Sequence, residues 1–443
     1  MSEFEPSTVQ RELRRFMPVP TLGVDVVEGP DAGRSVTVEC ESLSVGTAAD
    51  NALTLSDEAV SRYHLELVRL DRGVRVRDLG STNGTLIGGV KLERGIVQPG
   101  AMLEIGRSKL RLKGGQDAVV ELHGADALGE LRGRTPVMRR VMADVMKLSR
   151  SDVPVLLLGE SGTGKELIAR ALHEHSPRAQ KPFVIVDCVA LVPNLVASEL
   201  FGHEAGAFTG GDRRRIGAFE HAHGGTLFLD EVGELPLDLQ AYLLGVLERR
   251  RFRRVGGDRD LEVDVRLVSA TNRDLRSEVN SGRFRLDLYY RLAATCIEVP
   301  PLRERADDIP LLVAHFIRQL GSSATVDDVV GENMRERLRT YGWPGNVREL
   351  RNMVEVSLAL GETLMVGREA PPLADSPWLS PTAGGRLGSM TYREARAAVI
   401  REFERTYFTA LLERTDNNVS RAAREAEMNR PHLSELLHRL GLR

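Results

Sequence analysis

The chain has 443 residues, of which 28% are charged and 42% hydrophobic, and its formal net charge at pH 7 is −3. This balance excludes a predominantly disordered chain, and the length allows two to four domains, each with its own core. With so little net charge, any contact with nucleic acid must come from local clusters of basic residues.

The cysteines and the apolar segments indicate the compartment. Cys40, Cys188 and Cys296 lie far apart, without the spacing of a metal site, and are expected to be buried thiols in a reducing environment. The N-terminus has no apolar signal core, and no window approaches eighteen uninterrupted apolar residues. We therefore expect a cytoplasmic protein with no membrane partner.

Residues 1–20 are interpreted as an N-terminal extension, and residues 21–115 as an all-β domain. Apolar residues there recur at every second position, for example in His64–Leu70 and Val74–Arg77, with Gly, Asp and Asn clusters between the runs. Short alternating strands broken by turns predict a β-sandwich.

Three motifs in this sandwich carry a resemblance: Ser44-Val45-Gly46, Ser61-Arg62-Tyr63-His64 and Asp78-Leu79-Gly80-Ser81-Thr82-Asn83-Gly84-Thr85. Together and in this order they resemble the forkhead-associated (FHA) domain, which binds phosphothreonine peptides. The resemblance implies that Ser61 and Arg62 lie at the phosphate, that Asn83 holds the peptide backbone, and that His64 braces the loops.

One position departs from the FHA pattern. Thr47 stands where the family usually carries an arginine that grips the phosphate. One lost charge-assisted hydrogen bond is worth roughly 1.5–3 kcal/mol, or about ten- to a hundredfold in affinity. The alternative is that Ser61, Asn83 and Gly84 only shape turns, in a domain used for packing or self-association.

Residues 116–130 are expected to be a linker, although Val119–Leu122 could add a last strand to the sandwich. From residue 131 to 367, apolar strands alternate with helical patterns. This alternation predicts an α/β domain with a parallel sheet and a ligand at the carboxyl edge of the strands.

A phosphate-binding loop follows the strand Val155–Leu158: Gly159, Glu160, Ser161, Gly162, Thr163, Gly164 and Lys165. Its glycines let backbone N–H groups surround phosphate oxygens, the next helix points its positive end at them, and Lys165 adds charge at the β and γ groups. Glu166 replaces the Ser or Thr that commonly binds magnesium.

Two later strands end in polar groups. The strand from Gly224 ends in Asp230 and Glu231; Asp230 is predicted to hold Mg²⁺, directly or through water, and Glu231 to polarise the attacking water. The strand from Val265 ends in Asn272, which could sense the γ-phosphate. The strand Pro182–Asp187 completes this part of the sheet.

The chain from about residue 131 to its end looks like a bacterial enhancer-binding protein, an AAA+ ATPase that activates sigma-54 RNA polymerase holoenzyme. The motifs are GESGTGKE, ELFGHE, GAFTGG, GTLFLDE, VPPLRER and WPGNVREL. The resemblance implies ATP and Mg²⁺ as cofactors, a helical subdomain and a homo-oligomeric ring, with six subunits as the family expectation. In this family Glu166 after the lysine is usual.

Family roles transfer to individual positions. Phe208 and Thr209 match the pair that contacts sigma-54, in a loop that ends in Gly211 where the family has alanine. Arg285 and Arg291 match the arginines offered to the neighbouring subunit's nucleotide, and Arg348 matches the sensor arginine within the same subunit. Asp187 stands where an asparagine often restrains the catalytic glutamate.

A cluster of arginines occupies the place of a second pore loop and could equally be a solvated face: Arg249, Arg250, Arg251, Arg253 and Arg254. Residues 368–389, rich in Pro, Gly, Ser and Ala, are expected to be a flexible linker.

Residues 390–443 resemble the Fis-type helix-turn-helix domain, an all-α module that binds upstream enhancer DNA. Small residues at Ala422 and Ala423 would let two helices cross closely. Two groups of residues are candidates for DNA contact: Arg430, His432, Ser434 and Glu435 for base edges, and Arg421 and Arg424 for phosphates. A helical hairpin used only for dimerisation is the alternative.

The sequence as a whole thus predicts a multidomain activator with an FHA sensor, an AAA+ motor and a DNA tether. No response-regulator receiver domain is found in it, so the expected input is a Ser/Thr kinase product carrying phosphothreonine. One alternative is a DNA-binding regulator whose ATPase controls assembly without remodelling sigma-54. Another is a phosphopeptide scaffold in which the sandwich is the main functional module.

Overall fold

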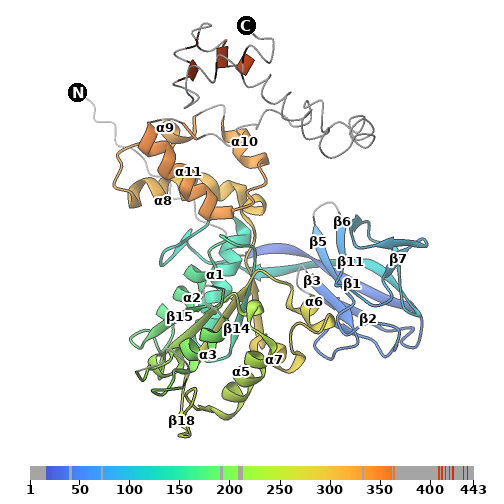
Figure 1. Cartoon of the computed structure of the whole chain (residues 1–443). Helices are drawn as coiled ribbons and strands as arrows, with labels where there is room; N and C mark the ends of the chain where they lie inside the picture. Colours follow the sequence, from blue (N-terminus) through green and yellow to red (C-terminus); the bar gives the residue numbers. More distant parts are fainter. Residues whose placement is uncertain are drawn as a thin grey trace. The chain divides into compact units, whose positions relative to one another are not determined.

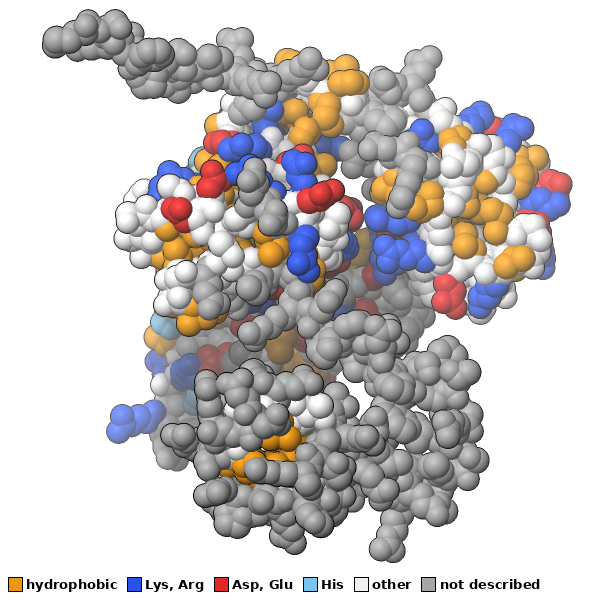
Figure 2. Space-filling model, turned by 90° about the horizontal axis from the view of Figure 1, so that it is seen from above, with side chains coloured by type: hydrophobic (Ala, Val, Ile, Leu, Met, Phe, Trp, Pro, Cys, Tyr) orange, Lys and Arg blue, Asp and Glu red, His pale blue; other side chains and the backbone are white. Residues whose placement is uncertain are grey.

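The computed structural model describes residues 16–38, 42–70, 73–189, 193–207, 213–331, 334–361 and 363–364, and ten residues between 408 and 437. The chain divides into two compact units, Met1–Leu364 and Met365–Arg443, and each is considered by itself. In the described residues no helix is both long and apolar enough to cross a membrane. On the face seen in Figure 2, Lys, Arg, Asp and Glu side chains are interspersed.

The first part of the larger unit is a β-sandwich (Figure 1). Its six-stranded sheet has the order β2-β1-β11-β10-β7-β8, and its five-stranded sheet has the order β4-β3-β5-β6-β9. Alternate residues such as Leu65, Leu67, Val74 and Val76 are fully buried between the sheets, as the period of two requires. The all-β sandwich expected of an FHA domain is confirmed. The strands are β1 (Phe16–Glu28), β2 (Ser35–Val38), β3 (Ser42–Gly46), β4 (Leu53–Thr54), β5 (Leu65–Leu70), β6 (Gly73–Asp78), β7 (Thr85–Ile87), β8 (Val90–Leu92), β9 (Arg94–Val97), β10 (Met102–Ile105) and β11 (Ser108–Glu121).

Strands β1 and β11 extend beyond residues 21–115. Phe16 pairs with Glu121, and the ladder continues through Pro20 opposite Asp117. Residues 16–20 and 117–121 therefore form a two-stranded antiparallel ribbon, because each strand satisfies backbone hydrogen bonds of the other. Val119 to Glu121 are the end of β11, which agrees with the alternative of a last strand in this part of the expected linker.

The second part is a three-layer α/β domain. Its five strands lie in the order β15-β16-β19-β14-β20, and every neighbouring pair is parallel. Val155 and Leu157 of β14 pack with α1 and α2 on one face, whereas Leu156 belongs to the core with α5 and α7 on the other. The α/β prediction is confirmed. The elements are α1 (Pro136–Ser149), β14 (Val155–Leu158), α2 (Lys165–Glu174), β15 (Phe183–Asp187), α3 (Pro193–Phe201), α4 (Ala218–His221), β16 (Thr226–Asp230), α5 (Leu237–Arg249), β19 (Arg266–Thr271), α6 (Leu275–Asn280), α7 (Leu286–Leu292) and β20 (Thr295–Glu298).

A helical subdomain follows the sheet, as expected for an AAA+ protein. Its described residues form a 3-10 turn, η2 (Leu302–Asp308), and four helices: α8 (Ile309–Gln319), α9 (Val326–Val330), α10 (Arg335–Thr340) and α11 (Asn346–Leu360). Two small hairpins lie outside the main sheet: β12 (Ala127–Leu128) with β13 (Leu131–Arg132), and β17 (Arg251–Phe252) with β18 (Leu261–Glu262).

In the second unit the described residues form one apolar cluster, which includes Leu411, Ala422, Ala423, Leu433 and Leu437. Ala422 and Ala423 are buried, as a close helix crossing requires. The six predicted DNA-contacting residues all lie outside the described residues: Arg421, Arg424, Arg430, His432, Ser434 and Glu435.

Candidate functional site

The phosphate-binding loop connects β14 to α2. Gly162 and Gly164 have φ values of 78° and 103°, and residues that carry a Cβ rarely adopt such values. The Lys165 ammonium is buried and donates to the carbonyl oxygens of Gly159, at 2.8 Å, and Glu160, at 3.3 Å. The loop thus combines a fixed cation with the N-terminus of a helix, which is the chemistry of a phosphate site.

The predicted acidic pair lies at the same edge of the sheet. Asp230 ends β16 opposite Asp187 of β15, and Glu231 follows with a φ of 52°. One Glu231 oxygen is 3.4 Å from Lys165 Nζ, and the other accepts the Asn272 N–H at 2.9 Å. The tertiary structure therefore brings Lys165, at the start of α2, together with Glu231 and Asn272, which follow the ends of β16 and β19.

The environment of Asp230 suits a hard cation. Burial raises the pKa of Asp230, and the nearby Glu231 carboxylate raises this pKa further. The described residues contain no cluster of three His, Cys, Asp or Glu that could cage a metal, but Mg²⁺ commonly takes only one or two carboxylates together with substrate phosphates and water. Asp230 fits that donor set.

The helical subdomain closes directly onto the phosphate loop. Arg348 donates to Ser161 Oγ at 2.9 Å, Asn346 Nδ2 donates to Ser161 O and Glu160 Oε2, and Arg303 forms two hydrogen bonds with the Glu160 carboxylate. Glu160 therefore faces the subdomain. Glu166, in contrast, pairs with Arg170 on the exposed side of α2.

Three residues of this contact were not identified from the sequence: Arg303, Arg305 and Asn346. Arg305 is 2% exposed and donates to the carbonyl of Thr163 at 2.7 Å, and burial lowers the pKa of Arg305 to about 10. Two motifs already noted, VPPLRER and WPGNVREL, contain these residues. The signal available in the sequence was the presence of polar residues in these motifs, but their burial and partners could not be read from it.

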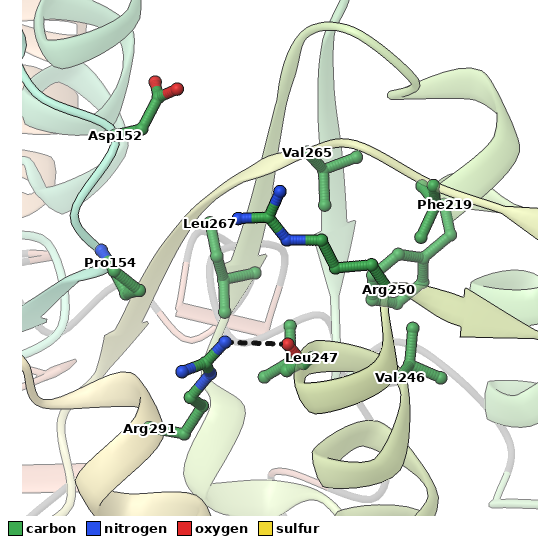
Figure 3. A pocket seen from close by; sticks show the side chains of 10 residues that line it. Asp152, Pro154, Phe219, Val246, Leu247, Arg250, Val265, Leu267 and Arg291 are labelled. Carbon is green, nitrogen blue, oxygen red and sulfur yellow. Dashed lines mark hydrogen bonds between the residues drawn. The ribbon is translucent and has the colours of Figure 1, made fainter.

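The two arginines expected to act on a neighbouring subunit are bonded within their own chain. Arg285 forms two hydrogen bonds with Asp287, and Arg291 donates to the carbonyl of Leu247 at 2.9 Å. Arg291 and Arg250 line a pocket of about 260 Å³ whose apolar walls include Phe219 and Leu267. Figure 3 shows these side chains and the hydrogen bond from Arg291 to Leu247. Within one chain, neither arginine is bonded to the phosphate loop.

The loop that carries the predicted sigma-54 contacts is described only at its base. Phe208, Thr209 and Gly211 lie outside the described residues, while Ala207 lies close to Gly256.

Arg254 is 8% exposed and pairs with Glu204 and Glu220. Because Arg254 is buried, it does not belong to a solvated face. Arg251 and Arg253 of the same cluster do form exposed ion pairs, with Glu262 and Asp260 of the β17–β18 hairpin.

The predicted phosphopeptide residues lie in adjacent loops of the sandwich. Ser61 Oγ accepts the Thr82 N–H at 2.9 Å, and Asn83 Nδ2 donates to the carbonyl of Ala59 at 2.7 Å. The side chains of Arg62 and Asn83 are exposed. The backbone N–H of Thr47 donates to the carbonyl of Ser61, so the position of the absent arginine is next to Ser61.

His64 joins these loops from inside the domain. It is fully buried, its Nδ1 accepts the Ser61 N–H at 3.1 Å, and its Nε2 lies 3.2 Å from the carbonyl of Gly84. This pair of partners requires a neutral ring protonated on Nε2. Burial holds the pKa of His64 below its ordinary value, although Asp78 opposes the shift.

Acidification is therefore expected to destabilise the sandwich. In the unfolded chain His64 takes up a proton near about pH 6.5, whereas the folded chain resists it, so stability is lost as pH falls below about 6.5, at no more than ~1.4 kcal/mol per pH unit. Thermal unfolding between about pH 8 and pH 5.5 measures this. His173 in α2 and His315 in α8, whose pKa values burial also lowers, add a loss of the same sign to the stability of the ATPase domain and its helical subdomain.

The variant His64→Gln isolates the contribution of this residue. Its amide does not titrate, so the stability of this variant should depend less steeply on pH than that of the unmodified chain. An unchanged pH dependence would show that the pKa of His64 is the same in the folded and unfolded chains.

Comparison with known proteins matches each part of the larger unit. Residues 131–298 match the family model of the sigma-54 interaction domain, residues 303–371 that of the AAA+ ATPase lid domain, and residues 25–116 that of the cytoplasmic domain of an inner membrane component of T3SS.

Similar proteins match about seventy per cent of the chain. The chain is 43% identical over 307 residues to transcriptional regulatory protein GlrR of Escherichia coli strain K12, covering 69% of this chain and 67% of that protein. It is 41% identical over 340 residues to the DNA-binding transcriptional regulator NtrC of Azospirillum brasilense, covering 72% of this chain and 71% of that protein. A crystal structure of NtrX from Brucella abortus in complex with ADP matches at 34% identity with a TM-score of 0.52, and the match covers 71% of this chain and 70% of the NtrX chain.

Proposed function

Because this chain belongs to the family of sigma-54-dependent transcriptional regulators, we propose that it binds and hydrolyses ATP to remodel sigma-54 RNA polymerase holoenzyme, so that promoter DNA opens. The observation that carries the proposal is Glu231, held between Lys165 and the Asn272 N–H at the phosphate loop. A carboxylate in this position is placed to act on a water that attacks the γ-phosphate.

Each residue of the site has a proposed task. The N–H groups at the start of α2 and the Lys165 ammonium hold the phosphates, and Arg348 and Asn346 connect the nucleotide site to the helical subdomain. Asp230 would hold Mg²⁺, which neutralises charge on the phosphates when it is bound. Glu231 orients and polarises the water, and Asn272 links that carboxylate to the end of β19.

Hydrolysis is proposed to require a ring, with six subunits as the family expectation. Arg285 and Arg291 would leave their partners within the chain and stabilise charge on the neighbouring subunit's transferred phosphoryl group, an effect of order 10³–10⁵ in rate. The related NtrX was crystallised with ADP and with ATP, which supports nucleotide binding here.

The N-terminal sandwich is proposed to receive the regulatory signal, and the C-terminal domain to bind DNA. The sandwich would bind a phosphothreonine protein, the product or partner of a Ser/Thr kinase, through Ser61, Arg62 and Asn83. The C-terminal domain would tether the ring to upstream enhancer DNA.

Thr209→Ala is expected to separate hydrolysis from remodelling. Loss of a central interface contact of ~2 kcal/mol would lower promoter opening by about thirtyfold, while ATP hydrolysis should continue because Thr209 is not among the residues proposed to bind the nucleotide. The assay uses the full chain, ATP and purified sigma-54 holoenzyme, and scores promoter opening beside phosphate release. Thr340→Ala, at the end of α10, is the control and should leave both unchanged.

Gly211 gives the assay a second use. Hydrolysis without opening in the unmodified chain, rescued by Gly211→Ala, would mean that the loop grips sigma-54 poorly because the extra glycine adds backbone freedom. Hydrolysis without opening and without rescue would favour the alternative, a DNA-binding regulator whose ATPase controls assembly only.

A further inference from the structure

Helix α6 of the ATPase domain contacts both loops that carry the proposed phosphopeptide residues. Asn280, at the end of α6, donates from Nδ2 to the carbonyl of Tyr63 at 2.6 Å and to the carbonyl of Leu79 at 3.1 Å. Tyr63 lies between Arg62 and His64 in one loop, and Leu79 precedes Gly80 in the other. A single amide group therefore ties the two loops to the ATPase domain.

The two residues whose carbonyls accept these bonds are buried. Tyr63 and Leu79 are 0% and 2% exposed, and they share one core cluster with Leu275, Leu288 and Tyr289 of the ATPase domain. The rings of Tyr63 and Tyr289 meet edge to face, with centroids 5.5 Å apart. An apolar contact of this kind shields the Asn280 hydrogen bonds from water, which makes their loss costly.

An ion pair completes the contact at the start of α6. Arg77 of β6 lies 3.1 Å from Asp274, whose carboxylate caps α6 by accepting the N–H groups of Arg276 and Ser277. Both ends of α6 are thus held by the sandwich, at Asp274 and at Asn280.

Helix α6 belongs to the same segment of chain as Asn272, Arg285 and Arg291, which have proposed roles in ATP hydrolysis. Asn272, which bonds Glu231, lies two residues before Asp274. Arg285 is the residue just before α7, Tyr289 and Arg291 lie on α7, and both arginines are bonded within their own chain. A restraint on α6 and Tyr289 is therefore a restraint on Asn272 and on both arginines.

We propose that Asn280 is a positioning residue for the ATPase reaction. Its hydrogen bonds to Tyr63 and Leu79, together with the contact between Tyr63 and Tyr289, form a latch that keeps the segment from Asn272 to Arg291 against the sandwich, with Arg285 and Arg291 in their arrangement within the chain. Because the same loops carry Ser61, Arg62 and Asn83, the latch joins the proposed phosphopeptide site to the proposed trans arginines. The inference rests on the proposed ATPase function.

The first test breaks the latch by Asn280→Asp. The new side chain has the same shape, but its carboxylate cannot donate to either carbonyl and repels both. Steady-state hydrolysis by the full chain should show a kcat raised by about fivefold or more, the low end of allosteric coupling between sites, with an unchanged KM for ATP, because the phosphate loop keeps its contacts. Ser281→Ala, which removes one local hydrogen bond to Glu278, is the matched control and should leave kcat unchanged.

The second test closes the latch covalently. A Cβ built at Gly80 would lie 3.4 Å from Ser277 Oγ, which suits a disulfide between Gly80→Cys and Ser277→Cys. Oxidation of this double variant should lower kcat, and a reductant should restore it. The positive φ of Gly80, 71°, affects both redox states alike, and the Gly80→Cys single variant corrects for the native thiols.

The outcomes separate the latch from the ATPase itself. Two results would overturn the latch while leaving the proposed ATPase intact. One is an unchanged or lowered kcat in a folded Asn280→Asp chain, and the other is a kcat of the double variant that does not change on oxidation. A merely structural role for Asn280 would lower kcat through lost active protein, opposite to the expected rise. Absence of any hydrolysis by the unmodified chain would refute the proposed function and the latch with it.

Discussion

Glu231→Gln is expected to lower kcat for ATP hydrolysis by about 10²–10⁴, the usual contribution of a general base, while the affinity for ATP is kept. The glutamine is isosteric and can still accept the Asn272 N–H, which Glu231 accepts at 2.9 Å. It lacks the negative charge that polarises the attacking water and that faces Lys165 at 3.4 Å. Phosphate release and nucleotide binding, measured on the same preparation, check the two parts of this prediction.

Glu234→Gln is the matched control for that experiment. Glu234 lies three residues further along the chain and pairs with Arg273, so neutralising it should leave kcat close to that of the unmodified chain. A Glu231→Gln chain that kept more than about a tenth of kcat would place the catalytic base elsewhere, because general-base contributions are rarely that small.

Arg285→Ala and Arg291→Ala are each expected to lower kcat by about 10³–10⁵ if these arginines act across the subunit interface. Within one chain Arg285 is bonded to Asp287, and Arg291 to the carbonyl of Leu247, so neither substitution removes a contact to the chain's own phosphate loop. The expected effect therefore appears only in the ring, as a loss of hydrolysis at protein concentrations where rings form.

Mixing two inactive variants tests the direction of this action. A ring that contains Arg285→Ala and Glu231→Gln subunits has interfaces with an intact glutamate on one side and an intact arginine on the other. At equal amounts and random order about a quarter of the sites are intact, and hydrolysis should recover to that extent. Arg283→Ala, which removes an exposed pair with Glu278, is the control and should remain active. A mixture no more active than its two components would rule out action in trans.

The alternatives raised from the sequence make different predictions in these experiments. A phosphopeptide scaffold would tolerate Glu231→Gln in its biological role and fail with Arg62→Ala. A regulator whose ATPase controls assembly only would hydrolyse ATP and bind DNA, but it would never open a promoter. The sigma-54 activator requires hydrolysis and the loop residues Phe208 and Thr209 together.

The sequence by itself determined the fold classes and the local chemistry of the sites. The period of two in residues 21–115 predicted the sandwich, and alternating strands and helices predicted the parallel sheet, because these patterns reflect which faces of an element are buried. The phosphate loop is one contiguous segment and the two acids at the end of β16 are adjacent, so their chemistry could be read from the sequence. Since parallel strands end at one edge, the meeting of Lys165, Glu231 and Asn272 also followed.

Only the tertiary structure decided which distant residues meet. Asn280 lies 217 residues from Tyr63 in the chain, and Asn346 lies 186 residues from Glu160; no local pattern encodes such pairs. The burial of Arg254, the contact of Arg305 with the phosphate loop, and the continuation of β1 and β11 beyond residues 21–115 likewise depend on partners remote in sequence. Periodicity shows that a face is buried, but only packing of the whole chain selects what buries it.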